Sequence, residues 1–551
     1  MLDEDSSVSR LDKAFARFLA QRTPFDAVQK QAFETIVMSL SYEQNQGHNC
    51  IRLDDEGRAL VLASGLAQSA DAARRDEPLP LVVEQDRLYL YRYWFYENRL
   101  ALRIGAMTQS SRSIENIDAL LNGYFDECTE GIDWQRTAAK MAVTQRFSMI
   151  TGGPGTGKTT TVVKILALLQ QLAGDKPLLI ALAAPTGKAA MRLQQSIGSN
   201  KADLPCSDAV KQHIPETVTT LHRLLGAMPP SPYFRHDANN PLVYDLVVVD
   251  EASMVDLALM SKLLDALKSD AGLILLGDKD QLASVESGAV LADLTQVLPD
   301  HTVELKISHR FTGAIKELAD AVNTQQEAAA WQVLQAGHDK VALLTEDLID
   351  FIAAQQFAYL QLIRSGAEFE DCYRAFSRFQ VLCSNRQGKN SVADINYRVE
   401  QLLSAQKLIN LTGLWYVGRP VMVTQNNAAL HLFNGDIGIC MPDKERGGKL
   451  MVFFQRPDGS VKKYLPTRIP HCETVFAMTI HKSQGSEFEE VLIVLPETVN
   501  PVLTKELLYT AITRAKETVK LFADETVFNE TVRQKVERVT GLADKFSIKT
   551  V

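Results

Sequence analysis

The stretch GGPGTGKT, at residues 152–159, has the residue types and spacing of a phosphate-binding loop. It follows the apolar run FSMI and precedes a stretch with helical periodicity, which is the context that such a loop requires. Its glycines let backbone N–H groups turn towards phosphate oxygens, and the start of the helix favours their negative charge. Lys158 would reach the β- and γ-phosphates, and Thr159 would ligate Mg²⁺. The predicted nucleotide-binding residues are Gly152, Gly153, Pro154, Gly155, Thr156, Gly157, Lys158, Thr159 and Thr160.

Two further apolar runs end in polar residues. LVVVDEAS is typical of a buried strand that delivers Asp250 and Glu251 at its carboxyl end. Asp250 would hold Mg²⁺ through water, and Glu251 would orient and deprotonate the attacking water. An exposed acidic turn is the alternative, but the acidic pair and its distance from the phosphate loop favour catalysis. LILLGDKDQ places Gln281 where it could sense the γ-phosphate, although a surface turn could look similar.

Length and composition narrow the class of protein. A chain of 551 residues is too long for one hydrophobic core, and 46% hydrophobic with 23% charged residues is ordinary for a soluble globular protein. No apolar run approaches the roughly 20 residues that span a bilayer, and the acidic N-terminus lacks the apolar core of an export signal. The seven cysteines are scattered without a CxxC pair, which indicates reduced thiols in a cytoplasmic protein.

The net charge of −9 is uneven along the chain. The first 130 residues carry 14 basic against 21 acidic side chains, and the remainder carry 44 against 46. The acidic N-terminal part is therefore the poorest candidate for a phosphate-binding surface, whereas the rest can still hold a local basic groove.

The apolar patterning predicts several units. From residue 133, short apolar strands alternate with helices, and a second alternation begins near Phe379, so we expect two parallel sheets with helical crossovers. Short strands and Gly/Asn/Asp turns between Thr412 and Cys472 indicate a small β-barrel inserted into the second unit. The first 125 residues hold helix-like stretches at Leu11–Leu19 and Val28–Leu40. They also hold the β-like pair LPLVVEQDRLYLYRYW, whose aromatic cluster is more typical of a core or a protein interface than of a base-stacking surface.

The second unit has no phosphate loop of its own, yet it carries two polar constellations, AMTIHKSQGSEF and LYTAITRAK. Two such units can bind ATP between them, with the loop supplied by one and arginines supplied by the other. Hydrolysis would then open and close the cleft and step DNA held across both units. A GTPase is disfavoured because the chain has no NKxD motif for guanine.

The motifs in their order resemble those of superfamily 1 helicases, and specifically the RecD family. They are DWQRTAAKMAV, GGPGTGKTTT, APTGKAAMRL, TTLHRLLG, VVVDEASM, GDKDQLASVESGAVL, SHRF, GRPVMVTQNN, LFNGDIGI, TIHKSQGSEF and YTAITRA. They run from about Asp133 to Lys516, and the first 125 residues match less sharply. The resemblance implies an α/β fold with two RecA-like motor domains at 126–316 and 317–551, an SH3-like insert at about 412–472, and an N-terminal domain at 1–125 that docks on the RecC subunit.

The resemblance also implies an activity. It implies an ATP-dependent 5′→3′ DNA helicase that uses ATP and Mg²⁺, acts on single-stranded and duplex-end DNA, and has no membrane association. The partners implied are RecB and RecC, with the nuclease in RecB, and the process implied is double-strand break repair by homologous recombination. Gln135 would read adenine through its amide. Arg310 and Arg514 would be arginine fingers, since a planar guanidinium suits a spread phosphoryl charge. Gln484 and Gly485 would neighbour the γ-phosphate.

Candidate DNA contacts lie on loops that follow strand ends. Hydroxyl, amide and basic groups at such places contact phosphate and sugar and so position a strand without reading its sequence. Each of these residues could instead be a helix cap or a solvated loop residue. They are Thr186, Lys188, His222, Asn385, Arg386, Asn427, Asn434, Thr479, His481 and Lys482.

Other functions stay open at this point. They are a self-contained RecD-like helicase, a regulatory ATPase in a binding subunit, and a metal nuclease that uses Asp300, Glu304 and Lys306 of LPDHTVELKISHRF. Three residues between Asp300 and Glu304 leave no room for the paired strands that usually build a nuclease site. We instead expect a single strand in which apolar residues at 303, 305 and 307 alternate with polar ones. The segment 226–244 is either a strand-separating hairpin or a plain loop.

Overall fold

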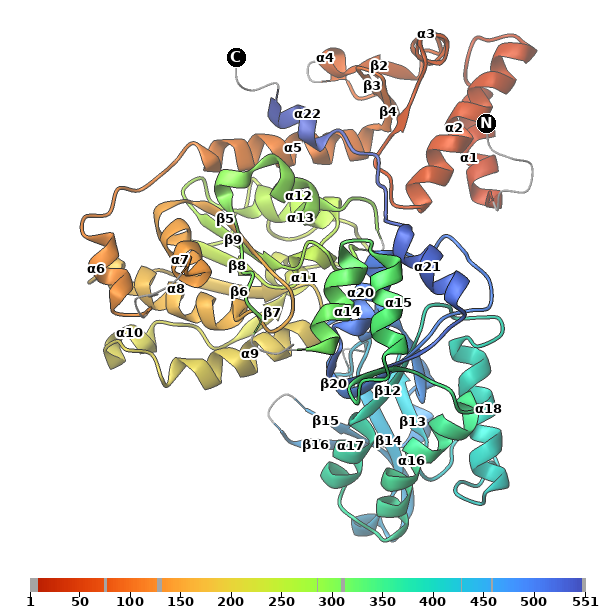
Figure 1. The fold of residues 1–551 in the computed structure, drawn as a ribbon. Helices are drawn as coiled ribbons and strands as arrows, with labels where there is room; N and C mark the ends of the chain where they lie inside the picture. The colour runs from red at the N-terminus through yellow and green to blue at the C-terminus, as the bar shows by residue number, and fades with distance from the viewer. Residues whose placement is uncertain are drawn as a thin grey trace.

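The computed structural model describes residues 8–73, 77–125, 131–284, 286–308, 313–427, 429–456 and 459–547. These residues form four β-sheets with helices packed around them (Figure 1). Two of the sheets are parallel, as the alternation of apolar strands and helices predicted. Arg310, one of the two predicted arginine fingers, lies outside the described residues.

The P-loop unit is built on a six-stranded parallel sheet with the strand order β10-β5-β9-β8-β6-β7. Val247 and Val249 pack on one face of the sheet, and Leu246 and Val248 pack on the other, so the strands are buried on both sides. The strands are β5 (Phe147–Thr151), β6 (Ile180–Ala184), β7 (Val218–Thr220), β8 (Leu246–Val249), β9 (Gly272–Gly277) and β10 (Thr302–Glu304).

Helices cover both faces of this sheet. One face packs against α7 (Trp134–Thr144), α8 (Lys158–Ala173) and α9 (Gly187–Lys201), and the other against α5 (Tyr91–Thr108), α12 (Leu257–Ala266) and α13 (Val290–Val297). Shorter helices are α6 (Ile117–Asn122), α10 (Asp208–Gln212), α11 (Leu221–Leu225), and the 3₁₀ turns η1 (Ala252–Met254) and η2 (Pro299–His301).

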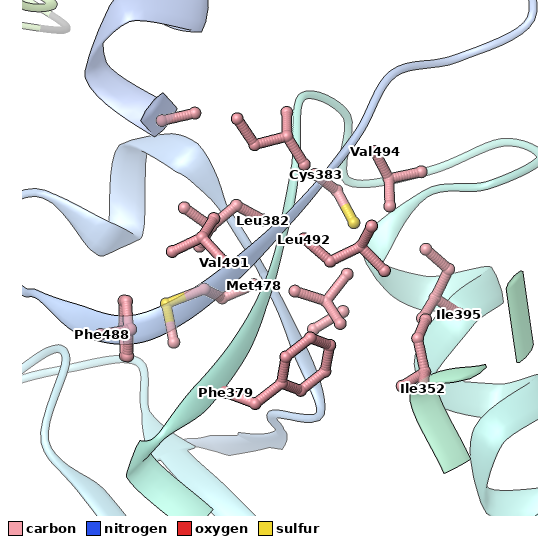
Figure 2. Close-up of a cluster of buried hydrophobic side chains, with 14 of the residues drawn as sticks. Ile352, Phe379, Leu382, Cys383, Ile395, Met478, Phe488, Val491, Leu492 and Val494 are labelled. Atoms are coloured by element: carbon pink, nitrogen blue, oxygen red, sulfur yellow. The ribbon is translucent and has the colours of Figure 1, made fainter. Parts of the chain in front are cut away.

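The second unit is a five-stranded parallel sheet with the order β11-β20-β19-β12-β18. Figure 2 shows Leu382 of β12 and Leu492 of β19 packed in its core with Ile352 and Ile395 from two covering helices. The strands are β11 (Val341–Leu343), β12 (Phe379–Cys383), β18 (Ala477–Thr479), β19 (Phe488–Val494) and β20 (Ala515–Phe522). The helices are α14 (Ala314–Asn323), α15 (Glu327–Gln335), α16 (Leu348–Arg364), α17 (Phe369–Ser377), α18 (Val392–Ala405), α19 (Ile480–Ser483), α20 (Lys505–Ile512) and α21 (Glu525–Arg533).

An antiparallel sheet interrupts the second unit between α18 and β18, where the sequence predicted a β-rich insert. Its strand order is β16-β15-β14-β13-β17, around a core of its own that includes Val421, Val452 and Phe454. We call it the antiparallel insert. Its elements are β13 (Pro420–Val423), β14 (Ile437–Asp443), η3 (Lys444–Arg446), β15 (Lys449–Gln455), β16 (Val461–Tyr464), η4 (Pro466–Arg468) and β17 (Cys472–Thr474).

The N-terminal unit combines helices with a small four-stranded sheet of order β1-β4-β3-β2. Both predicted helical stretches lie within helices, but the predicted β-like pair is wrong in its second half. The hairpin ends at Leu90 and residues from Tyr91 onwards form α5, where the buried Trp94 belongs to a helix face and not to a strand. The elements are α1 (Arg10–Ala20), α2 (Ala27–Asn45), β1 (Ile51–Arg52), α3 (Asp55–Ala63), β2 (Ala67–Ser69), α4 (Ala70–Ala73), β3 (Leu81–Glu84) and β4 (Arg87–Leu90).

The segment around Glu304 also differs from its prediction. β10 ends at Glu304, opposite the last residue of β5, because the phosphate loop turns away there and leaves nothing to pair with. Leu305 is buried, but Ile307 is 59% exposed, so the predicted strand does not reach it. The Glu304 carboxylate pairs with Lys279 at 3.2 Å, and the Lys306 ammonium lies over the Trp134 ring. The three nuclease-like side chains therefore do not converge on one point.

The C-terminal end of the chain returns to its beginning. After α21 an extended segment leads to α22 (Leu542–Ser547), which packs against α5 beside the N-terminal unit (Figure 1). Within the described ranges, none of the helices combines the length and the apolar character needed to cross a membrane.

Candidate nucleotide-binding site

The phosphate loop connects β5 to α8, as the sequence predicted. Gly157 has φ +83° and a Cβ there would lie 2.5 Å from Nε2 of Gln135, so only glycine fits. Gly152 has φ +149° and a Cβ there would lie 2.7 Å from the Leu305 carbonyl oxygen. The Lys158 ammonium donates to the carbonyl oxygens of Gly152 and Gly153, at 3.0 Å for the second. The loop therefore holds the Lys158 ammonium against its own backbone, where it could contact a bound phosphate.

A cavity of about 400 Å³ lies against this loop. It joins residues from both parallel-sheet units, since its wall includes β8 and β9 ends from one and Arg514 from the other. Among the predicted residues, the structure brings Lys158, Thr159, Asp250, Glu251, Gln281 and Arg514 together here. The full lining is Pro154, Gly155, Gly157, Lys158, Thr159, Thr160, Ala189, Arg192, Leu193, Ser196, Asp250, Glu251, Asp278, Gln281, Glu487 and Arg514.

The two acids after β8 are held in a strained turn. Glu251 has φ +52°, in the left-handed region, and its N–H donates to Oδ1 of Asp250 at 2.9 Å. Burial, together with the charge of Glu251, raises the pKa of the Asp250 carboxyl to about 6. A cation placed beside this pair would offset both the cost of burial and the repulsion between the two carboxylates. The donor set therefore fits Mg²⁺, with the Thr159 hydroxyl as a second protein ligand. Across the described ranges no three His, Cys, Asp or Glu side chains form a metal cluster, so nucleotide phosphates and water would supply the other ligands.

Asp278 is a buried carboxylate that the sequence analysis missed. It follows β9 as Asp250 follows β8, and although Gly277 separates it from the four apolar residues, this similar pattern could have revealed it. Its Oδ2 accepts from Nε2 of Gln281 at 2.9 Å and from the Tyr509 hydroxyl at 3.2 Å. Burial raises the pKa of the Asp278 carboxyl to about 6, although the charge of Lys158 opposes that shift. Asp278 thus orients Gln281 towards the cavity.

Arg514 enters the site from the second unit, just after α20. Its guanidinium is only 2% exposed and donates to Oε1 of Gln281 at 2.9 Å, to the Thr510 carbonyl at 3.0 Å and to the Ser486 carbonyl at 3.3 Å. Burial lowers the pKa of this guanidinium, while the nearby carboxylates of Glu251 and Asp278 favour its charge. A rigid arginine at the edge of a phosphate-binding cavity is the arrangement that stabilises charge on a transferring phosphoryl group.

Two more bonds join the units next to Gln281. The Leu282 N–H donates to the Thr510 hydroxyl at 2.9 Å, and Nε2 of Gln484 donates to the Leu282 carbonyl at 3.0 Å. Gln484 therefore lies beside residue 282, and neither Gln484 nor Gly485, the predicted neighbours of the γ-phosphate, is in the cavity wall.

An ion pair that the sequence analysis missed also spans the two units. Arg192 on α9 of the P-loop unit pairs with Glu487, which precedes β19 of the second unit, and both line the cavity. The two residues stand inside the motifs APTGKAAMRL and TIHKSQGSEF, but nothing in the spacing of those motifs indicated that they meet.

Gln135, the predicted reader of adenine, lies on α7 beside the phosphate loop. Its Nε2 donates to the Thr156 carbonyl at 3.4 Å. The amide therefore lies against the phosphate loop, and its contact with adenine stays a prediction.

The predicted DNA-contacting residues gather along strand ends of both units. The hydroxyls of Thr186 and Thr479 accept from the first turns of α9 and α19, so both act as helix caps. β6 pairs with β7 and β12 pairs with β18, which brings Thr186 towards His222 and Asn385 towards Thr479. His222 is exposed, with its ring 5.7 Å from that of Phe234. Their contacts with DNA stay predictions.

Most of the other predicted DNA-contacting residues form ion pairs or hydrogen bonds with neighbouring residues. Arg386 and Lys482 both pair with Glu473, at 2.8 Å and 2.6 Å. The Asn427 amide oxygen caps a turn by accepting from the Leu430 N–H at 3.1 Å, and the Asn434 N–H donates to Oδ1 of Asn426 at 2.9 Å. Burial lowers the pKa of His481.

Lys188 lies beneath the antiparallel insert. Burial, with the nearby charge of Arg192, lowers the pKa of Lys188 to about 8, and Asp436 of the insert opposes that shift. The Phe433 ring of the insert lies 4.8 Å from the Arg223 guanidinium on α11. The insert therefore covers the strand-end edge of the P-loop unit.

A nucleotide cavity with a phosphate loop from one parallel-sheet unit and an arginine from another defines a two-unit P-loop motor protein. Family models match as "AAA domain" at residues 135–287, "UvrD-like helicase C-terminal domain" at 474–522 and "RecBCD enzyme subunit RecD, N-terminal domain" at 4–64. The RecBCD enzyme subunit RecD of Mycolicibacterium smegmatis is 39% identical, over 87% of this chain and 85% of that one. That of Haemophilus influenzae is 35% identical, over 84% and 80%. The chain belongs to the RecD family of helicases.

Two further proteins are similar to the chain at lower identity. The ATP-dependent RecD2 DNA helicase of Deinococcus radiodurans is 33% identical, over 73% of this chain and half of that one. Among solved structures, a Bacteroides Pif1 helicase in complex with ADP-AlF3 and ssDNA has a TM-score of 0.40 and 17% identity, over 74% of this chain and 95% of that one.

Replacing Arg514 tests its role at the cavity. Arg514→Ala removes the guanidinium, and we expect kcat for ATP hydrolysis to fall by about 10³-fold, the lower end of the range for an arginine finger. Arg514→Lys keeps a charge but cannot donate to Gln281, Thr510 and Ser486 together, so its loss should stay above about 100-fold. Arg533→Ala, at a 53% exposed side chain of the same unit, is the matched control. An Arg514→Ala chain that keeps more than a tenth of the native kcat would contradict the assignment.

The raised pKa of Asp278 makes a prediction about stability. A carboxyl whose pKa is raised in the folded state destabilises the fold as pH rises from its unfolded value, near 4, to about 6. Asp278→Asn cannot ionise, so we expect the melting temperature of the variant relative to the native chain to rise between pH 5 and pH 7.5. The free energy of unfolding of the variant relative to the native chain should increase by about 1 kcal/mol over this range, since a shift of one pKa unit corresponds to about 1.4 kcal/mol. A melting-temperature difference that stays constant over that range would show that this carboxyl titrates normally.

Proposed function

We propose that the chain is the ATP-driven 5′→3′ DNA helicase subunit of a RecBCD-type helicase-nuclease. The observation that carries the proposal is the contact between Arg514 of the second unit and Gln281 of the P-loop unit at the edge of the cavity. A nucleotide held there would touch both units, so its hydrolysis can change their separation. That change is what moves a DNA strand gripped by both.

The residues divide the work of hydrolysis. Lys158 and the loop N–H groups would hold the β- and γ-phosphates, with Gln135 on the base side. Thr159 and Asp250 would hold Mg²⁺, which supplies charge neutralisation when bound. Glu251, whose carboxylate shares the cavity wall, would orient the attacking water and take its proton. Gln281 would sense the γ-phosphate, and Arg514 would stabilise the charge that develops on it.

The DNA path would run along the strand ends at Thr186, His222, Asn385 and Thr479. These residues lie at or just beyond the ends of neighbouring strands in the two sheets, and a single strand laid across them would contact both units. We propose the antiparallel insert, an SH3-like barrel by resemblance, as its guide. We also propose the division into 1–125, 126–316 and 317–551, since each range holds a sheet of its own.

The N-terminal unit would dock on RecC, and RecB would carry the nuclease. Three large apolar side chains on α1 and α2 face solvent: Leu11 is 74%, Phe18 50% and Val28 78% exposed. Exposed apolar residues on adjoining helices suit a partner surface. The match of this region to the RecD N-terminal model favours a complex, whereas the match to RecD2 favours the alternative of a stand-alone helicase. The process proposed is double-strand break repair by recombination.

Lys158→Gln tests the motor assignment. The amide removes the charge that would hold the phosphates, so we expect kcat for DNA-stimulated ATP hydrolysis to fall by at least about 100-fold. The melting temperature should stay close to that of the native chain, because among the described residues the Lys158 ammonium donates to the loop's own carbonyls. Undiminished hydrolysis would overturn the motor assignment.

A strand-displacement assay tests direction and partnership. With substrates that carry either a 5′ or a 3′ single-stranded tail, the native chain should displace only the strand of the 5′-tailed one, and only with ATP and Mg²⁺. Stable co-purification with RecB and RecC supports the subunit, and a solitary monomer with full unwinding supports the stand-alone helicase. DNA cleavage by the purified chain with Mg²⁺ would instead support the nuclease.

A further inference from the structure

Three segments that are distant in sequence meet at Arg538. They are the loop that follows α2 (46–50), the loop that follows Gln281 (282–284 and 286–288), and the segment between α21 and α22 (534–541). The Arg538 guanidinium donates through Nη1 to the Gly288 carbonyl at 2.7 Å and to the Glu286 carbonyl at 3.1 Å. Through Nη2 it donates to the Ser284 carbonyl at 2.6 Å.

Direct bonds also join the three segments in pairs. The Val539 N–H donates to Nδ1 of His48 at 2.9 Å, and the Asn49 N–H donates to the Val539 carbonyl at 3.0 Å. The Gly288 N–H donates to the Gly47 carbonyl at 3.0 Å. The N-terminal unit, the P-loop unit and the end of the second unit are therefore fixed to one another at a single place.

The loop after Gln281 is anchored at Leu282, which is buried in the hydrophobic core of the second unit. Beyond Leu282 the loop borders a cavity of about 440 Å³, whose wall includes Gln281, Ala283, Arg538 and Val539. On that side, polar bonds hold the described residues of the loop in position. Arg538 supplies a partner to three of its carbonyls, and hydrogen bonds from a charged donor are stronger than neutral ones. Burial lowers the pKa of the Arg538 guanidinium, whereas the charge of Asp293, which also lines this cavity, favours its positive charge.

We propose that Arg538 is a positioning residue for ATP hydrolysis, which holds the loop so that Gln281 stays directed at the cavity. The inference rests on the proposed function, because it takes Gln281 as the sensor of the γ-phosphate. Arg538 does not line the nucleotide cavity, so its effect on the reaction passes through Gln281 alone. Binding of ATP, which depends on the phosphate loop, is not affected by it.

The test is a double-mutant cycle on the full chain, read as kcat and KM for DNA-stimulated ATP hydrolysis. Arg538→Gln should lower kcat about 10-fold with KM for ATP unchanged within about two-fold. In the Gln281→Ala background the same substitution should change kcat by less than about two-fold, since the group that it positions is already gone. A purely structural role would give the same loss in both backgrounds.

His48→Ala is the matched control. It removes a bond of the same junction, to the Val539 N–H, without touching the carbonyls of the 284–288 loop, and we expect kcat within about two-fold of native. Should Arg538→Gln fail to fold, Arg538→Lys serves in the same cycle, because an ammonium keeps the charge but lacks the fork that reaches separated carbonyls.

The outcomes separate this inference from the proposed function. A native chain that hydrolyses ATP, with Arg538→Gln and Arg538→Lys at native kcat or with equal losses in both backgrounds, overturns the positioning role and leaves the motor intact. A native chain without DNA-stimulated hydrolysis overturns the proposed function and the positioning role with it. Loss of kcat only in the background that retains Gln281 supports the inference.

Discussion

The hydrogen bond from the Arg514 guanidinium to Gln281 is the contact on which the rest of the site depends. It is 2.9 Å long, fully enclosed, and joins the two parallel-sheet units next to the phosphate loop. A buried guanidinium is costly unless each side of it is bonded, and here two carbonyls of its own unit hold the other donors. The second unit therefore presents a preorganised charge to the P-loop unit.

Burial sets the electrostatics of the cavity. Asp250 and Asp278 end adjacent strands, β8 and β9, and burial raises the pKa of each carboxyl to about 6. The charge of Lys158 acts to lower the pKa of both carboxyls, but burial outweighs it. Two buried carboxylates at adjacent strand ends form an acidic part of the cavity wall, and a divalent cation bound beside them would reduce the cost of their burial.

Sequence patterning predicted the structure correctly where a single physical rule determines the local fold. The glycine spacing of the phosphate loop and the apolar run before Asp250 specify a strand end with a phosphate site, because parallel strands finish at one edge. Sequence patterning failed where tertiary pairing decides. The sequence does not show that β5 ends opposite Glu304, and Ile307 lies outside the sheet because β5 ends there. It also does not show that a helix begins at Tyr91, directly after a hairpin. Arg192 and Glu487 are 295 positions apart, and only the packing of two units brings them together.

The end of the chain gives the N-terminal unit a fixed place. Lys545 of α22 pairs with Glu84 of β3, and the buried Glu97 of α5 accepts from the Gly541 N–H at 3.2 Å and from the Asn49 amide at 2.8 Å. A unit joined by a flexible linker would move independently of the motor, whereas this one is bonded to the last residues of the second unit. Hydrogen bonds therefore run from the loop after α2, through Val539 and Arg538, to the carbonyls of Ser284, Glu286 and Gly288. The nucleotide cavity and the N-terminal unit are in this way linked through one continuous network of bonds.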